Sequence, residues 1–204
     1  MNPLNSIVGT IVSGIVLALI IIFATADAHI VAAMPLNSII IWVHVFAGIV
    51  WIGLLYYFNF VQVPALGEAM KDEGGPGPAG IAKYIAPRAL LWFRWGAAFT
   101  WLTGALFLYF RGQLHNAFTL GMMTESGNAY AMTIGIGAWL GTIMLFNVWV
   151  LIWPAQKKVL GMVEASADEI AKAKKVALMA SRANTMMSIP LIMSMVGAGH
   201  GIFM

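Results

Sequence analysis

The sequence predicts an all-α membrane protein, a five-transmembrane-helix bundle that forms a single integral membrane domain over residues 1–204. Hydrophobic residues make up 61% of the chain and charged residues only 9%, whereas charged residues are about a quarter of a typical soluble domain. A helix needs about 20 mostly apolar residues to cross the hydrocarbon core of a bilayer. The stretches that meet this requirement are residues 7–25, 38–63, 88–110, 129–153 and 185–203.

The first predicted span shares features with a signal peptide, because it starts without charge and is followed by the small residues Ala24, Ala26 and Ala28. It has no basic residue before the apolar run, and the run is long for a signal peptide, so we expect it to remain as a helix. The second and fourth spans are expected to end at Pro64 and Pro154, since proline interrupts the helical hydrogen bonds.

The connecting segments are polar and contain helix signals of their own. The segment KDEGGPGP at residues 71–78 is a loop with strong helix breakers, and residues 115–123 are expected to hold a short interfacial helix. Ser166 and Glu169 have the spacing of a capping box, which predicts a helix start. We expect this helix to continue into the fifth span, where Pro190 is a candidate kink.

The distribution of Lys and Arg predicts the orientation, because these residues gather in cytoplasmic loops. Of the basic residues that lie in the loops and near their ends, only Arg111 belongs to the loops after the first and third spans. The segments after the second and fourth spans carry Lys71, Lys83, Arg88, Lys157, Lys158, Lys172, Lys174, Lys175 and Arg182. The N-terminus is therefore expected in the cytoplasm and the C-terminus outside. This orientation explains the net charge of +3 without a nucleic-acid partner.

Two histidines, His44 and His200, lie inside apolar helical runs. An ionisable side chain at membrane depth costs about 2.5–3.5 kcal/mol on insertion scales, so it marks a candidate functional site. His44 lies six residues into its span, about 9 Å from the helix start, and His200 is close to the end of the last span. Both are therefore expected near the outer face of the membrane.

Two imidazoles at matching depth predict a b-type haem held between the second and fifth spans, with His44 and His200 as the iron ligands. Gly48 and Trp51 share a helical stripe with His44, and Gly48 leaves room for a flat macrocycle, so both are candidate cofactor-binding residues. Two histidine ligands leave no open iron position, which favours electron transfer. The alternative is that His44 only hydrogen-bonds a neighbouring helix while the glycines mediate close packing.

Other metal chemistry is restricted by composition. The chain has no Cys, which excludes disulfides, thiolate metal sites, iron–sulfur clusters and covalent c-type haem attachment. A copper or zinc site is an alternative, because imidazole suits these metals and all four histidines are expected on the outer side. These histidines are His29, His44, His115 and His200.

A polar set is predicted in the cytoplasmic half of the bundle. Arg94 lies about two turns inside the third span, and Asn147 about two turns from Pro154. An arginine with amides would suit an anionic or planar polar ligand such as a purine or a quinone head, so Arg94 and Asn147 are weak candidates for substrate binding. The alternative is interhelical hydrogen bonding. Other members of the set are Asn59, Gln62, Gln156, Arg182 and Asn184.

Four segments carry a resemblance to a known family: WVHVFAGIVWIGLLYYFNFVQVPAL, PRALLWFRWGAAFTWLTG, NVWVLIWPAQKKV and SRANTMMSIPLIMSM. They resemble the membrane domain of the bacterial urate hydroxylase (PuuD) family, also called the urate oxidase N-terminal domain. The resemblance implies a multi-pass protein of the bacterial inner membrane and a urate-oxidising activity that passes electrons to a fused cytochrome c domain. The chain carries no such cytochrome domain, so the expected acceptor is a separate protein. More loosely, the His44 segment resembles the histidine-bearing first helix of copper-resistance-D and HemJ-type membrane proteins, the latter linked to haem.

These observations leave three hypotheses for function. The leading one is a membrane redox protein that binds haem b near the outer face and exchanges electrons with an outer-face partner such as cytochrome c, as part of a respiratory complex. The second is a urate or purine oxidoreductase that uses Arg94 and Asn147. The third is a cofactor-free structural subunit of a membrane complex.

Overall fold

The computed structural model describes residues 2–25, 36–123 and 128–201, and these residues form helices, turns and loops without a strand. The predicted all-α class is therefore confirmed. The contacts divide the chain into two units, Met1–Ile39 and Ile40–Met204, and each is described by itself. That the whole chain acts as one integral membrane domain stays a prediction.

The first unit contains the short 3₁₀ turn η1 (Pro3–Asn5) and the helix α1 (Ile7–Thr25), which has the bounds predicted for the first span. The side chain of Asn2 caps η1 by accepting a hydrogen bond from the N–H of Leu4 at 2.9 Å. The predicted loop that holds Asp27 and His29 lies outside the described residues, apart from its last positions.

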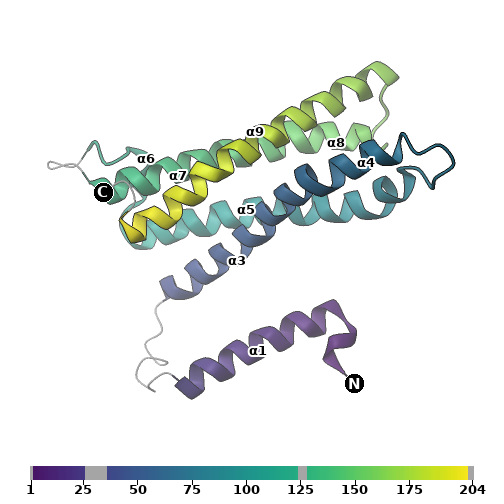
Figure 1. Ribbon diagram of the computed structural model, residues 1–204. Helices are drawn as coiled ribbons and strands as arrows, with labels where there is room; N and C mark the ends of the chain where they lie inside the picture. The colour runs from purple at the N-terminus through teal and green to yellow at the C-terminus, as the bar shows by residue number, and fades with distance from the viewer. Residues whose placement is uncertain (1, 26–35, 124–127, 202–204) are drawn as a thin grey trace. The chain divides into compact units, whose positions relative to one another are not determined.

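The second unit is a bundle of long helices (Figure 1). Chain segments α3–α4 and α7–α8 run in one direction, and α5 and α9 run in the opposite direction. The elements are α3 (Leu36–Tyr56), η2 (Tyr57–Gln62), α4 (Val63–Ala69), η3 (Ile81–Ile85), α5 (Ala86–Phe110), α6 (Leu114–Phe118), α7 (Ala129–Phe146), η4 (Asn147–Ile152), α8 (Trp153–Val159) and α9 (Ala167–His200).

The expectation that helices end at Pro64 and Pro154 is wrong. In both places the chain stays helical through the proline, because a π-helical turn, η2 or η4, directly precedes the segment that contains it. A wider turn relieves the clash between the proline ring and the preceding carbonyl. Proline has no backbone N–H, but at the first positions of a helical segment this N–H would have no partner within the segment. The helices are therefore longer than predicted at these ends.

The start of α9 confirms the predicted capping box. The backbone N–H of Glu169 donates to Ser166 Oγ at 3.3 Å, and the backbone N–H of Ser166 donates to the Glu169 carboxylate at 2.9 Å. As predicted, α9 then continues without interruption, with Pro190 inside it, to His200. The short helix expected at residues 115–123 is present over a smaller range, as α6, and its position at the membrane interface stays a prediction.

Among the described residues, four helical segments are long and apolar enough to cross a membrane: Ile7–Thr25, Leu36–Ala69, Ala129–Val159 and Ala167–His200. The predicted third span, α5, is not one of them, because Arg88 and Arg94 and its tryptophans lower its hydropathy. These four helices confirm the prediction of a multi-pass membrane protein. The number of five spans and the orientation of the termini remain predictions.

The centre of the second unit is a close-packed apolar core. Trp51, Leu55 and Phe93 are almost completely buried, and the ring of Phe58 meets that of Phe93 edge-on at 5.4 Å between centroids. Helices α7 and α9 approach closely where the backbone N–H of Gly137 donates to Ser194 Oγ at 3.0 Å. This core fixes the positions of α3, α5, α7 and α9 around the site described next.

Candidate functional site

His44 is held at one ring nitrogen by the neighbouring helix. Its Nδ1 lies 2.8 Å from the backbone carbonyl oxygen of Thr100 on α5, and Thr103 Oγ1 lies 3.5 Å from the same nitrogen. A carbonyl oxygen only accepts, so Nδ1 carries the proton and the lone pair of the neutral ring is on Nε2. Among the described residues, Nε2 has no hydrogen-bond partner.

A glycine on α5 makes room for this ring. A Cβ atom added to Gly104 would lie 3.1 Å from Nδ1 of His44 and 2.8 Å from Cε1, and the second distance is closer than real Cβ atoms approach. Gly104 is therefore required for the imidazole to lie flat against α5 and reach the Thr100 carbonyl.

His44 lines a cavity of about 710 Å³ bounded by α3, α5, α7 and α9. This volume lies within the usual range of small-molecule and cofactor sites, about 300–1,000 Å³. None of the residues that line it carries a formal charge, and glycines from all four helices contribute to the wall. The polar residues in the wall are His44, Trp51, Tyr56, Thr100, Trp101 and Tyr130.

The two residues predicted to share the His44 stripe, Gly48 and Trp51, also line the cavity. A Cβ on Gly48 would make only an ordinary contact with Thr100 Cγ2, at 3.7 Å, so a small side chain would fit at this position. Trp51 is only 1% exposed, and its Nε1 is buried without a hydrogen-bond partner in the described part of the chain.

His200 lies elsewhere. It is exposed at the end of α9, and its Nδ1 is 2.9 Å from the carbonyl oxygen of Val196 on the same helix. Val196 and Gly199 line the cavity, but His200 does not. The structure therefore places one of the two predicted iron ligands in the cavity wall and does not bring the other beside it.

Three members of the predicted polar set make contacts between helices. The guanidinium carbon of Arg94 lies 3.8 Å from the centre of the Trp153 ring, and Asn147 Nδ2 donates to Asn184 Oδ1 at 2.8 Å. Neither Arg94 nor Asn147 lines the cavity. Asn184 in turn donates to the carbonyl oxygen of Met144 at 3.0 Å, so the amides link α9 to α7 and η4.

The remaining histidines do not assemble with His44 in the described residues. His115 is exposed on α6, whereas His29 lies outside the described part. Within that part, there is no group of three or more His, Cys, Asp or Glu side chains that could hold a metal ion.

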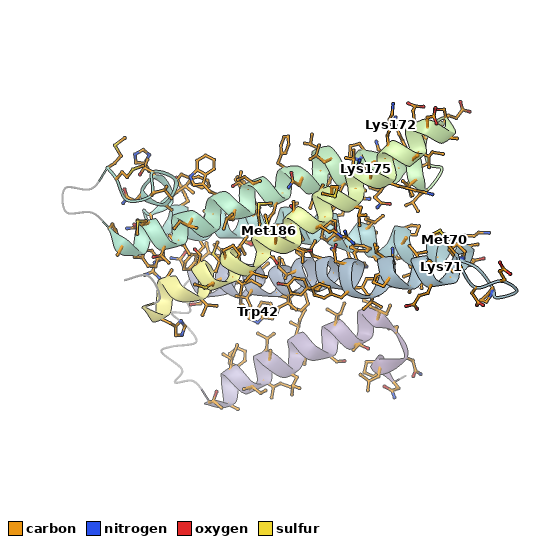
Figure 2. The ribbon with its side chains drawn as sticks, turned by 45° about the horizontal axis from the view of Figure 1, so that its top comes forward. Trp42, Met70, Lys71, Lys172, Lys175 and Met186 are labelled. Carbon is orange, nitrogen blue, oxygen red and sulfur yellow. The ribbon has the colours of Figure 1, made fainter. Side chains whose placement is uncertain are left out.

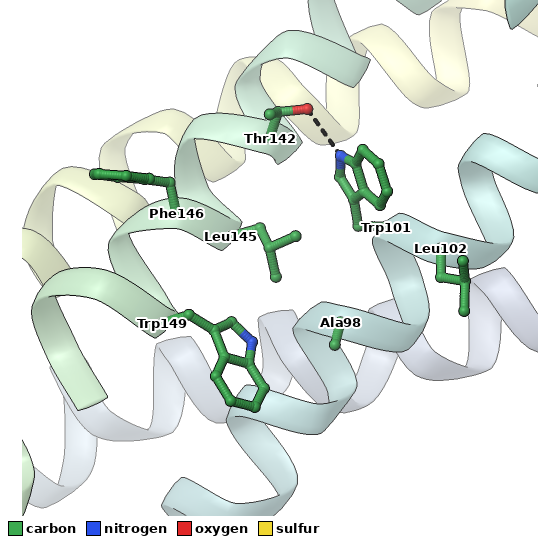
Figure 3. Close-up of a pocket in the computed structure, with 7 residues that line it drawn as sticks. All are labelled: Ala98, Trp101, Leu102, Thr142, Leu145, Phe146 and Trp149. Atoms are coloured by element: carbon green, nitrogen blue, oxygen red, sulfur yellow. Dashed lines mark hydrogen bonds between the residues drawn. The ribbon is translucent and has the colours of Figure 1, made fainter. Parts of the chain in front are cut away.

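A second hollow, of about 500 Å³, lies between α5 and α7 (Figure 3). Two of its polar side chains are already paired, since Trp101 Nε1 donates to Thr142 Oγ1 at 2.8 Å and Thr142 Oγ1 donates to the Ala138 carbonyl at 2.8 Å. The other lining residues are apolar except for Trp149, and none of the lining residues is titratable, so this hollow is not a candidate site.

Sequence reasoning missed Thr100, Thr103 and Gly104, which position the His44 ring. The available signal was the cluster of small and hydroxyl residues in the stretch TWLTG of an otherwise bulky, aromatic helix. Small residues at such spacing let another helix or side chain approach closely in a membrane. The sequence alone does not indicate that the approaching group is a histidine 56 residues earlier.

The fold and the cavity define the class as a multi-pass, all-helical membrane protein with one histidine in the wall of a partly open, uncharged cavity between its helices. Residues 113–204 match the model of the family described as urate oxidase N-terminal. The predicted family resemblance is therefore confirmed over the part of the chain that contains α6 to α9. The comparisons with curated proteins and with solved structures gave no match.

Proposed function

We propose that the protein is an integral membrane redox protein that binds a b-type haem through His44 and exchanges electrons with a partner near the outer face of the membrane. The observation that carries the proposal is the state of the His44 ring. Metal-bound histidines usually donate their other ring N–H to a carbonyl or carboxylate, which fixes the tautomer and makes the ligand more basic. His44 has this arrangement with Thr100 and keeps Nε2 free at the cavity wall.

The cavity also fits the size and character of the group. It is largely apolar, its volume is about 710 Å³, and the two glycines Gly48 and Gly104 line it near His44. A bound haem would supply one-electron chemistry, and the chain would hold the iron at His44 and surround the ring with apolar side chains.

His200 is the proposed second ligand. Its ring resembles that of His44 in that Nδ1 is tied to a backbone carbonyl, which leaves Nε2 available. His200 lies outside the cavity wall, so binding through both histidines requires the last turn of α9 to move toward the cavity. In the sequence, Gly199 and Gly201 flank His200 in this turn. This part of the proposal is separate from the His44 part and has its own test below.

The proposed topology has five spans, with α5 as the third. In support, α4 ends and α9 begins at the same end of the second unit, where Lys71, Lys172 and Lys175 gather (Figure 2), and α5 runs the length of the bundle between its neighbours. Basic residues at one end indicate the cytoplasmic side, which puts His44 in the outer half. We propose the bacterial inner membrane as the location and a cytochrome c or a respiratory complex as the partner.

The second candidate is a urate or purine oxidoreductase, which the family match favours. The matched region contains Asn147 but begins after Arg94, and both side chains have partners within the bundle. In this alternative, urate-dependent reduction of oxygen or of an added cytochrome would proceed without haem. The third candidate, a cofactor-free subunit, predicts neither a chromophore nor turnover.

The test is the reduced-minus-oxidised optical spectrum of protein purified from haem-sufficient cells. We expect a b-type spectrum in the native protein, its loss in His44→Ala, and its retention in the matched control His115→Ala, because His115 is exposed and outside the cavity. His200→Ala should keep the haem but change it from six- to five-coordinate. A native protein that holds no haem even after reconstitution, or a His44→Ala variant that keeps a full complement, would overturn the proposal.

A further inference from the structure

Two basic side chains from different helices lie over the same indole ring. The guanidinium carbon of Arg94, on α5, is 3.8 Å from the centre of the Trp153 ring, and Nζ of Lys157, on α8, is 5.9 Å from it. Because both distances are measured to one ring centre, the two charges are within about 10 Å of each other, close to the Debye length in 0.1 M salt. Their repulsion is therefore only partly screened, and an anion bound near both would offset it.

Neither of these two cations has a counter-ion in the described part of the chain. The neighbouring Lys158 forms an ion pair with Glu169 at 3.0 Å, but no carboxylate pairs with Arg94 or Lys157 there. A cation–π contact uses the charge of the guanidinium and leaves N–H donors at its edge without an acceptor. The pair therefore offers an anion both positive charge and unused hydrogen-bond donors.

The pair lies at the level where a membrane meets water. Trp153 and Lys157 are in the last two turns of Ala129–Val159, one of the helical segments able to cross a membrane. Tryptophans gather at this level, and the Trp149 ring, one turn before Trp153, meets that of Trp95 edge-on at 5.5 Å between centroids. Trp95 is 47% exposed, so the surface beside the pair is aromatic and faces lipid. An anion at this depth is most simply a lipid headgroup.

We infer that Arg94, Trp153 and Lys157 bind the phosphate group of an anionic phospholipid, with Arg94 donating to its oxygens and Lys157 adding a second positive charge. Arginine suits this role because its N–H groups match two phosphate oxygens. Basic sites between membrane helices are a recurrent means of recognising anionic lipids. None of the three residues lines the cavity at His44, so the inference is independent of the proposed haem. It also differs from the second candidate function, which combines Arg94 with Asn147.

The test is native mass spectrometry of the purified full chain in a nonionic detergent, titrated with phosphatidylglycerol. We expect Arg94→Gln and Lys157→Gln each to weaken binding about fivefold, the effect of one basic residue beside an anionic lipid surface. Two matched controls remove the same charge elsewhere: Arg88→Gln on α5, where Arg88 donates to the Tyr84 carbonyl at 2.6 Å, and Lys172→Gln on α9 (Figure 2). Both controls should bind the lipid as the native protein does.

Two further comparisons separate a built site from general attraction between charges. Arg94→Lys keeps the net charge but loses the planar donor pair, so it should bind phosphatidylglycerol more weakly than the native protein does. Phosphatidylcholine has the same phosphate with a compensating cation, and it should bind the native protein more weakly than phosphatidylglycerol. Inorganic phosphate at the concentration of the lipid should not displace it, since the ligand is held at the membrane surface.

The inference is overturned if the native protein binds the two lipids equally, if inorganic phosphate displaces phosphatidylglycerol, or if Arg94→Lys and Lys157→Gln bind it unchanged. Thermal unfolding shows which variants are folded. Lys157 is half-buried at the surface of α8, so Lys157→Gln provides the test even if the variants of Arg94 do not fold.

Discussion

The Nδ1 atom of His44 on α3 lies 2.8 Å from the carbonyl oxygen of Thr100 on α5. A carbonyl oxygen has two lone pairs, so Thr100 can accept from the imidazole while it remains part of the helix. This hydrogen bond links two helices inside the bundle, fixes which ring nitrogen carries the proton, and leaves the other nitrogen for a ligand. A hydrogen bond to a neighbouring helix is the structural role that the sequence analysis gave as the alternative for His44, and the proposed iron ligation would use the other ring nitrogen.

Gly104→Ala tests whether the ring position matters. The added Cβ would lie 2.8 Å from His44 Cε1, so we expect the ring to be displaced from Thr100, the bundle to lose about 1–3 kcal/mol of stability, and haem content to fall. Thermal unfolding and the reduced-minus-oxidised spectrum measure these effects. The control is Gly67→Ala, where an added Cβ meets nothing within 4 Å. Equal haem content and stability in the two variants would contradict the prediction.

The sequence predicted most helices closely because their signals are local. Apolar length placed α1, the end of α5 and the start of α7, and the pair Ser166 and Glu169 placed the start of α9. The helices that continue past Pro64 and Pro154 were not predictable in this way. Whether a proline ends a helix depends on whether the preceding turn widens, and here that turn also packs against α9 through Asn59, whose Nδ2 donates to Ser181 Oγ at 2.8 Å.

The site was predictable only in part for a similar reason. His44, Gly48 and Trp51 follow each other on one helix, so their common face could be derived from spacing, and all three line the cavity. Whether His200 faces the same space depends on the rotation of α9, and one residue changes the direction of a side chain by about 100°. That rotation is set by packing between distant segments, such as Ser194 against Gly137.

Two glycines of α7 provide a matched pair for the contact with α9. A Cβ on Gly137 would lie 2.7 Å from Met195 Cε and 2.9 Å from Ser194 Oγ, whereas one on Gly141 would meet only Leu191 Cδ1, at 3.6 Å. We therefore expect Gly137→Ala to destabilise the protein by about 1–3 kcal/mol and Gly141→Ala to have little effect, as measured by thermal unfolding in detergent. The reverse order of the two variants would show that α7 and α9 do not pack in this way.

The amide pair Asn147 and Asn184 is expected to stabilise the bundle as a unit. Asn184 is completely buried, accepts from Asn147 and donates to the Met144 carbonyl. Asn147→Ala leaves the buried Asn184 Oδ1 unpaired, at a cost of about 1–3 kcal/mol, and Asn184→Ala leaves the half-buried Asn147 Nδ2 without its partner. In a double-mutant cycle we expect the second alanine to cost less than it does alone, with a coupling of about 0.6–1.7 kcal/mol, as for other hydrogen bonds between membrane helices. Strictly additive losses would contradict the pairing.

The capping box of α9 predicts a pH dependence. With 34 residues α9 is about 51 Å long, more than the roughly 30 Å of a hydrocarbon core, so its charged start lies outside the membrane. The N–H of Ser166 and the ammonium of Lys158 lower the pKa of Glu169 to about 2 from its ordinary value of 4.5. A carboxylate with a lowered pKa stabilises the folded state above its unfolded pKa, and this contribution is lost as the pH falls through the folded value.

Native protein should therefore unfold at a higher temperature than Glu169→Gln at neutral pH, and the unfolding temperatures of the two should converge between about pH 4.5 and pH 2. Glu164→Gln, outside the capping box, is the control, and a constant difference between native protein and Glu169→Gln across this range would disprove the role of the charge.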